Sequence, residues 1–253
     1  ISAGLEAAVR ERTAELQEAN VELEAFVHCI SHDLRAPLRA ISGFAQALAE
    51  DFGDELRAPA GNRLARIRAA AGRMGAIIDD LLRLSHVGRS DLAMTSVDLA
   101  RLSREIVADL ASGSPERHVE TTVHDSIVVR GDERLLRLML ENLLGNAWKF
   151  TAATPAARIE VDGRKVAGGQ VELLVRDNGA GFDMDHVGKL FRPFQRLHAD
   201  ERFPGTGIGL AIVGSIVKRH QGSVRAEGAA GAGATFRVQL PASEDPVRGT
   251  GAV

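Results

Sequence analysis

Two neighbouring residues, His32 and Asp33, lie in a segment from Ser31 to Leu38 whose composition favours a helix. Pro37 follows the histidine by five residues. A proline inside a helix removes a backbone hydrogen bond and bends the helix, so the segment is irregular around one exposed nucleophile. We interpret His32 as a phosphate acceptor, although the same spacing also fits an ordinary surface histidine.

Three polar residues, Asn142, Asn146 and Lys149, lie at positions i, i+4 and i+7 of a helical run and therefore share one helix face. Two amides and an ammonium group suit a hard cation and a polyphosphate, and the alternative is a solvated helix face. A second cluster, Asp177 to Gly181, ends a strand-like run. Its aspartate can accept a hydrogen bond from an exocyclic amine, and its glycines let backbone approach a ring, but a tight turn would use the same residues.

A glycine-rich loop, Gly205 to Leu210, opens a helix, where N–H groups and the helix dipole favour phosphate. It is not a dinucleotide fingerprint, which needs a preceding strand in a βαβ unit, and no Gly-Lys-Ser/Thr ends it as in a Walker loop. Residues Leu190 to Arg196 hold two phenylalanines three apart and two arginines. An ordinary helix end that packs two aromatic rings would have the same pattern.

The elements that carry these residues follow from hydrophobic spacing. Apolar or small residues from Leu5 to Ile30 recur at spacings of three and four, with only Arg12 interrupting the pattern, which is typical of a parallel coiled coil. The next apolar position, Leu34, breaks the heptad beside the candidate acceptor. Amphipathic helices continue to about Glu50 and from Leu64 to Gly88, and pairing with a second copy as a four-helix bundle would bury both stripes. We expect a homodimer; the alternative is a monomeric hairpin packed on the following domain.

The pattern changes after a short polar linker. Strands are expected at 97–99, 118–123, 126–130, 158–166, 170–177, 223–227 and 234–240, and helices at 102–110, 133–150, 184–190 and 208–220. Strands interspersed with helices, without a regular βαβ alternation, favour an α+β sandwich with helices on one face of a mixed sheet. We expect a coiled-coil helix (1–25), an all-α dimerisation hairpin (26–90), a linker (91–95), the α+β domain (96–241) and a disordered tail (242–253).

Composition excludes several classes of protein. The formal charge of −3 gives no basic field for nucleic acid. One cysteine excludes an internal disulfide and fits a reducing compartment, and no apolar run approaches the roughly 20 residues that cross a bilayer. We expect a soluble, cytoplasmic chain without a membrane span, and the first residue, Ile1, indicates a fragment whose upstream part is missing.

Five motifs follow one another in a characteristic order. They are Ser-His-Asp-Leu-Arg-Ala-Pro-Leu at 31–38, Glu-Asn-Leu-Leu-Gly-Asn-Ala-Trp-Lys-Phe-Thr at 141–151, Asp-Asn-Gly-Ala-Gly-Phe at 177–182, Phe-Arg-Pro-Phe-Gln-Arg-Leu-His at 191–198 and Pro-Gly-Thr-Gly-Ile-Gly-Leu-Ala at 204–211. Together they resemble the sensor histidine kinases of two-component systems, in particular those whose catalytic cores follow phytochrome-like or PAS-type sensors. The resemblance covers residues 15–241.

The resemblance implies a histidine-phosphotransfer hairpin and a Bergerat-type ATP-binding domain that uses ATP and Mg²⁺. His32 would be phosphorylated on a ring nitrogen, with Asp33 as orienting group and general base, before transfer to an aspartate in the receiver domain of a response regulator. Asn146 would coordinate Mg²⁺, Asp177 would bind the adenine amino group, and Arg196 would stabilise the moving phosphoryl group. An upstream sensor domain would supply the signal. The other nucleotide contacts, including lid anchors, would be Asn142, Lys149, Phe150, Gly179, Gly181, Phe191, Phe194, Gly205, Thr206, Gly207, Gly209 and Leu210.

Two positions refine the expected activity. Related ATPases of this fold carry a water-activating glutamate where Asn142 stands, and Glu141, about 100° around the helix, should not replace it. Transfer to histidine is therefore favoured over hydrolysis. Ala36 stands four residues after His32, where family members that also dephosphorylate their partner commonly carry Thr or Asn, so we expect weak phosphatase activity.

Three other functions fit parts of the sequence. A dimeric signalling scaffold could bind nucleotide without transferring phosphate. A chaperone-type machine could hydrolyse ATP, although Asn142 disfavours it. A metal site could form from His28, Cys29 and His32, but no fourth ligand is evident.

Overall fold

The computed structural model describes residue 31 and residues 33–52, 58–89, 91–124, 127–195, 203 and 205–243. The chain divides into two compact units between His86 and Val87. The predicted coiled coil, His32, Arg196 and the chain beyond residue 243 lie outside the described residues. The prediction of a disordered tail from residue 242 is wrong at Ala242, whose N–H donates to the Gly169 carbonyl at 2.9 Å and which forms a bridge with Val129. Among the described helices, none is long and apolar enough to cross a membrane.

The first unit holds the two predicted amphipathic helices. Residues 33–52 are helical, and α2 (Ala58–Arg89) follows. The second helix begins earlier than its hydrophobic pattern suggested, because Pro59 lies in its first turn, where a missing N–H leaves no hydrogen bond unmade. The buried contacts within this unit include Leu38, Ala71, Ile78 and Leu82.

An ion pair between Arg35 and Asp79 joins the two described helices of the first unit. Arg35 Nη2 lies 2.7 Å from Asp79 Oδ1, with both side chains substantially exposed. An exposed pair of this kind contributes about 0–1 kcal/mol, so its main effect is to favour one register of the helices.

An apolar face of the same unit is left uncovered in the single chain. Its most exposed member is Phe44, at 74%. Such a face is typical of a surface that another protein covers. Among the described residues of the unit, the exposed large apolar side chains are Leu34, Ile41, Phe44, Leu48, Phe52, Ile67 and Met74.

The second unit is built on a mixed five-stranded sheet. The strand order is β2 (Glu120–Val123), β4 (Arg158–Val166), β5 (Gln170–Asp177), β7 (Gly233–Pro241) and β6 (Ser223–Ala229). Strands β2 and β4 are parallel, and the other neighbours are antiparallel. The unit also contains a two-stranded sheet, formed by β1 (Thr95–Asp98) and β3 (Val128–Gly131). A 3₁₀ helix, η1 (Met184–Lys189), follows β5.

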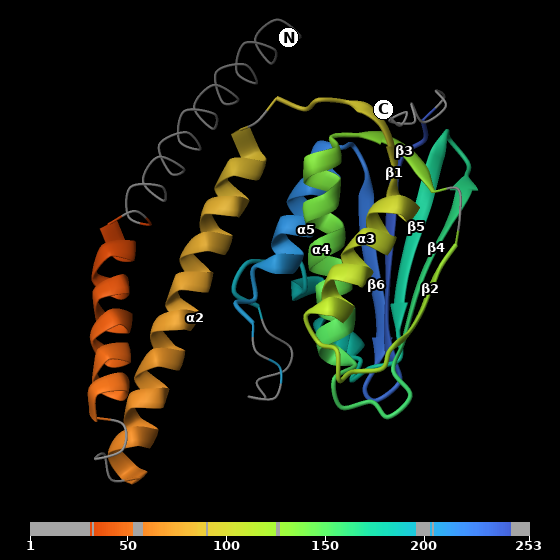
Figure 1. Ribbon diagram of the computed structural model, residues 1–253. Coiled ribbons are helices and arrows are strands. Elements are labelled where there is room, and N and C mark those ends of the chain that lie inside the picture. The colour runs from red at the N-terminus through yellow and green to blue at the C-terminus, as the bar shows by residue number, and fades with distance from the viewer. Residues whose placement is uncertain are drawn as a thin grey trace, which may run out of the picture. The chain divides into compact units, whose positions relative to one another are not determined.

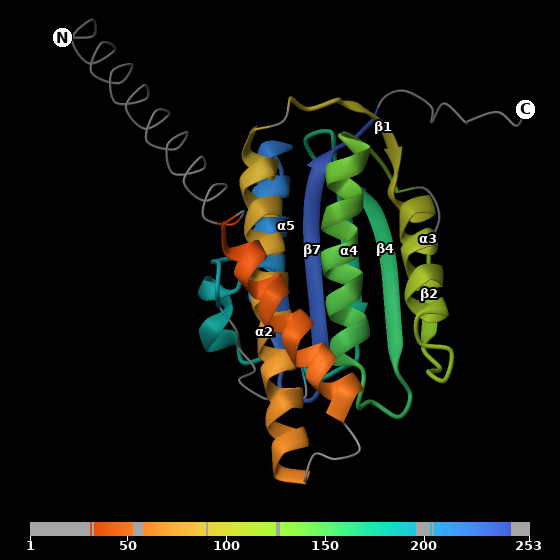
Figure 2. The same cartoon turned by 60° about the vertical axis from the view of Figure 1, so that its left-hand side comes forward.

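Three helices cover one face of the five-stranded sheet: α3 (Leu99–Ser112), α4 (Glu133–Phe150) and α5 (Gly209–Arg219) (Figures 1 and 2). Alternate residues of β5, such as Leu173 and Val175, are buried, as are Leu140 and Leu144 of α4. The α+β sandwich with helices on one face is thereby confirmed. Asp98 caps α3 by accepting from the Arg101 N–H, which is why this helix begins before the predicted residue 102.

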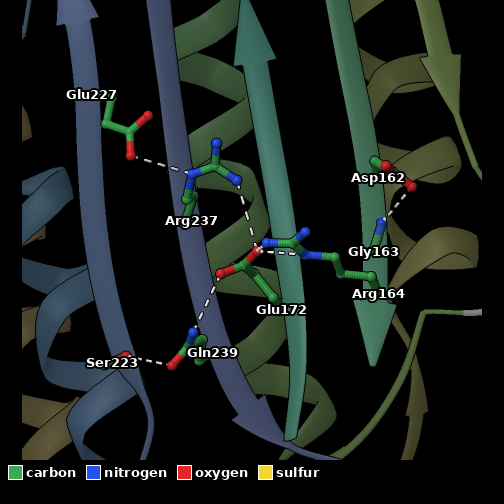
Figure 3. Close-up of polar contacts among 8 residues, drawn as sticks. All are labelled: Asp162, Gly163, Arg164, Glu172, Ser223, Glu227, Arg237 and Gln239. Carbon is green, nitrogen blue, oxygen red and sulfur yellow. Dashed lines mark hydrogen bonds and ion pairs between the residues drawn. The ribbon is translucent and has the colours of Figure 1, made fainter. Parts of the chain in front are cut away.

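The other face of the sheet carries a polar network, drawn in Figure 3. Glu172 on β5 is almost buried, and its Oε1 lies 2.6 Å from Arg164 Nη2 on β4 and 3.7 Å from Arg237 Nη1 on β7. Gln239 Nε2 donates to the second carboxylate oxygen at 3.3 Å. Hydrogen bonds and the two arginines lower the pKa of Glu172 although burial opposes them, so this carboxylate is held in its charged form.

Candidate functional site

A buried carboxylate, that of Asp177, lies at the end of the central strand β5 and is only 6% exposed. Its Oδ1 accepts a hydrogen bond from the Gly179 N–H at 2.9 Å, and the Ala234 backbone N–H also donates to it. Burial raises the pKa of Asp177 to about 6, while both amides oppose the shift. A strongly perturbed acid at a strand end is typical of a functional site.

The loop after Asp177 depends on its two glycines. Gly181 has φ 60°, and a Cβ there would lie 1.8 Å from the Ala229 carbonyl oxygen. At Gly179 a Cβ would lie 2.5 Å from the carbonyl oxygen of Phe150, the last residue of α4. These glycines therefore bring the loop against α4 and β6, which is a packing role in addition to the predicted lining of a base pocket.

The polar face of α4 meets the glycine loop, which we define as residues 205–209. The Asn142 amide donates to the Leu138 carbonyl at 2.8 Å, and its Oδ1 would lie 2.4 Å from a Cβ at Gly209. Lys149 Nζ lies 4.3 Å from the centre of the Phe150 ring and 3.2 Å from a Cβ built at Gly205. Two motifs that are distant in sequence thus come together.

Asn146 lies between these two contacts along α4 and is half-buried. Its carbonyl oxygen is a suitable ligand for a hard cation.

The glycine loop leads into α5 without a side-chain cap at Ile208. Thr206 Oγ1 accepts from the Ile208 N–H at 3.3 Å, and Gly207 has φ 76°. Leu210, in the first turn, is half-buried. Because the first N–H groups of a helix have no partner within the helix, this end of α5 can bind an anion.

The predicted aromatic anchors are in different environments. Phe191 packs near Gly214 of α5: a Cβ built at Gly214 would lie 3.5 Å from the Cβ of Phe191. Phe194 is 57% exposed and has φ 62°. A residue that the motifs did not single out, Phe203, is buried with its ring centroid 5.1 Å from that of Phe150. In the sequence, an aromatic residue just before the glycine loop is the signal that could have indicated this contact.

The helix of residues 33–52 continues through Pro37, and Asp33 and Ala36 are exposed on it. Ser31, immediately before His32, is buried. The structure thus brings the α4 face, the loop after β5 and the glycine loop together in the second unit, while the acceptor motif lies on the first unit.

Comparison with known families agrees with this division. Residues 131–244 match the family described as "Histidine kinase-, DNA gyrase B-, and HSP90-like ATPase", and residues 22–89 match "His Kinase A (phospho-acceptor) domain". The sheet unit is therefore an ATPase domain of that class, preceded by a phospho-acceptor domain. The chain belongs to the sensor histidine kinases of two-component systems.

Individual relatives span more than this chain. It is 35% identical to cyanobacterial phytochrome B of Nostoc sp. over 228 residues, which cover 89% of this chain and 30% of that protein. It is 36% identical to the sensor histidine kinase TrcS of Mycobacterium tuberculosis over 239 residues, 92% of this chain and 46% of TrcS. The crystal structure of full-length ShkA in complex with AMPPNP is similar with a TM-score of 0.63 and 27% identity, over 85% of this chain and 45% of ShkA. The chain thus spans less than half the length of these relatives.

Proposed function

We propose that this chain is the catalytic core of a protein-histidine kinase that transfers the γ-phosphoryl group of ATP to His32 and then to an aspartate of a response-regulator receiver domain. The observation that carries the proposal is the combination, in one chain, of a phospho-acceptor domain around His32 and an ATPase domain in which the buried Asp177 lies at the end of strand β5. The bound AMPPNP in the similar structure of ShkA supports nucleotide binding.

The nucleotide would lie between the polar face of α4 and the two loops that contact it, the loop after β5 and the glycine loop. Asp177 would accept a hydrogen bond from the adenine amino group, which suits a desolvated carboxylate that gains a donor on binding. The uncapped end of α5 and Lys149 would hold the phosphates. Bound Mg²⁺ would neutralise phosphate charge, and the Asn146 carbonyl oxygen is a suitable ligand for it.

In the transfer, a ring nitrogen of His32 attacks the γ-phosphorus, the bond from that phosphorus to the bridging oxygen of ADP breaks, and ADP leaves. Asp33, which is exposed on the helix, takes the proton from the other ring nitrogen. Arg196 stabilises the charge on the moving phosphoryl group. The phosphoryl group then passes from the imidazole to the carboxylate of the receiver domain, which restores the histidine.

The active form would be a homodimer. The exposed apolar residues of the first unit, led by Phe44, would be buried between two copies in a four-helix bundle. We assign residues 1–25 to a coiled coil that brings the signal from an upstream sensor domain, 26–90 to dimerisation and phosphotransfer, 91–95 to a linker and 96–241 to ATP binding. A cytoplasmic location would provide both ATP and receiver domains.

Incubation with ATP labelled in the γ-phosphate tests the proposal. The wild-type chain should acquire an acid-labile, base-stable label, and His32→Ala should not. His86→Ala, which changes another histidine of the same unit, is the matched control and should label normally. Nucleotide binding without label in the wild type would instead identify a signalling scaffold, and label that persists in His32→Ala would exclude this acceptor.

A further inference from the structure

A buried histidine, His220, lies at the C-terminal end of α5 and is 1% exposed. Its Nδ1 is 2.8 Å from the Ile216 carbonyl oxygen, and its Nε2 is 3.0 Å from the Asp132 backbone nitrogen. A carbonyl oxygen only accepts and an amide N–H only donates, so Nδ1 carries the proton and Nε2 accepts. The imidazole therefore links the end of α5 to Asp132, the N-cap of α4.

Helix α5 is thereby held against α4 at both ends. At its first residue, Gly209, the missing side chain allows Asn142 Oδ1 to lie 2.4 Å from where a Cβ would be. At its other end the contact is the one between His220 and Asp132. Figures 1 and 2 show the two helices side by side on the sheet. The helix has 11 residues and a length of about 16 Å, so it transmits a displacement of one end to the other as a rigid body.

The N-cap of α4 and the end of α5, which His220 joins, also hold the chain that leads into this unit. The Ala93 N–H, in the stretch between α2 and β1, donates to Asp132 Oδ2 at 3.1 Å. The guanidinium of Arg219 donates to the Val87 carbonyl near the end of α2. A movement of Val87 or Ala93 would therefore act on the junction of Asp132 and the α5 end at which His220 lies.

The imidazole of His220 packs closely against the backbone at Gly131. A Cβ at Gly131 would lie 2.8 Å from His220 Cδ2 and 2.6 Å from Leu136 Cδ1. The ring thus packs directly on backbone with both nitrogens bonded, whereas an aliphatic side chain of similar size would leave the Asp132 N–H without its acceptor.

We propose that His220 is a positioning residue for the glycine loop: through Asp132 it fixes the α5 end that residues 87–93 also contact, and α5 carries that placement to residues 205–209. The assignment of the loop to phosphate binding rests on the proposed function. The placement of the loop by His220 does not, and it can be measured without nucleotide.

Two substitutions of His220 separate the cross-helix hydrogen bond from the packing. Glutamine places Oε1 near the position of Nε2 and can still accept from Asp132, whereas asparagine reaches only the position of Nδ1. His220→Asn should weaken MgADP binding about tenfold and accelerate amide hydrogen exchange in residues 205–210, while His220→Gln should stay within about twofold of the wild type. Lys218→Met, on the exposed side of the same turn, is the control and should change neither quantity.

Folding of each variant is followed by the fluorescence of Trp148, and Arg219→Met provides a second test if His220→Asn does not fold. This substitution frees the Val87 carbonyl without altering the imidazole, and it should also accelerate exchange in residues 205–210. Equal effects of asparagine and glutamine, or exchange that rises as much in β4 and β5 as in the glycine loop, would overturn the proposal. If the wild type bound no MgADP, the proposed function would fail, and the exchange experiment would still decide the role of His220.

Discussion

The carboxylate of Asp177 should make the second unit less stable at neutral pH, and replacing it by asparagine should reverse this. Burial raises its pKa from the usual 3.8 to about 6. A group whose pKa is raised on folding contributes its full stability below its unfolded pKa and loses it as the pH rises through its folded pKa. A change from 3.8 to about 6 corresponds to about 3 kcal/mol, lost mostly between pH 4 and pH 7.

Asparagine has nearly the same shape, stays neutral and keeps an oxygen that can accept from the Gly179 N–H. The free energy of unfolding of Asp177→Asn should therefore be nearly equal to that of the wild type at pH 4. Above pH 7 it should be higher than that of the wild type by about 3 kcal/mol. Urea unfolding at a series of pH values measures the difference. The probe is Trp148, the single tryptophan of the chain, which is 7% exposed in α4 of the same unit.

The same substitution should weaken MgADP binding at pH 8 by about tenfold or more, since an amide N–H₂ would meet the adenine amino group where a carboxylate oxygen would accept from it. Asp185→Asn, which neutralises an exposed aspartate in η1, is the control and should change neither stability nor affinity. The reasoning is refuted if the stability difference between Asp177→Asn and the wild type does not depend on pH, or if the variant binds MgADP as well as the wild type.

Three further substitutions test other features. Glu172→Ala should lower the free energy of unfolding by about 1–3 kcal/mol at pH 7, because Arg237 loses its buried partner (Figure 3). Because the pKa of Glu172 is lowered in the folded protein, the difference from the wild type should shrink as the pH falls below about 4.5. Urea titrations measure this difference. Gln221→Gly should raise that free energy by about 1 kcal/mol in the same assay, because Gln221 has φ 56° just after α5. Ala36→Thr should accelerate loss of phosphate from a phosphorylated receiver domain, followed on gels, and an unchanged rate would exclude a role of this position in the phosphatase reaction.

The parts of the fold that local pattern determines could be predicted from the sequence. Ile159 and Val161 of β4 and Val171, Leu173 and Val175 of β5 recur at every second position, and α4 has Asp132 as its N-cap. The bounds of these three elements agree with the predictions to the residue. The site depends on contacts between distant segments. The raised pKa of Asp177 results from burial between strands that pair with β5 from both sides, and no local pattern reports that burial. Likewise, His220 follows an amphipathic helix and belongs to no motif. Its role depends on the hydrogen bond to Asp132, which is 88 residues away in the sequence, and no local pattern reports that contact.

Asn142, which is one of the predicted nucleotide contacts, also lies in the packing between α4 and α5. Asn142 stands where related ATPases carry a water-activating glutamate, and here its amide donates to the Leu138 carbonyl while its oxygen faces Gly209. A glutamate could not donate to that carbonyl, and its longer side chain would enter the space that Gly209 leaves open. The asparagine therefore allows α5 to approach α4 closely and, under the proposed function, leaves this position without a base that would activate water. One residue would then account both for the close packing of the glycine loop and for transfer of the phosphoryl group to histidine in preference to water.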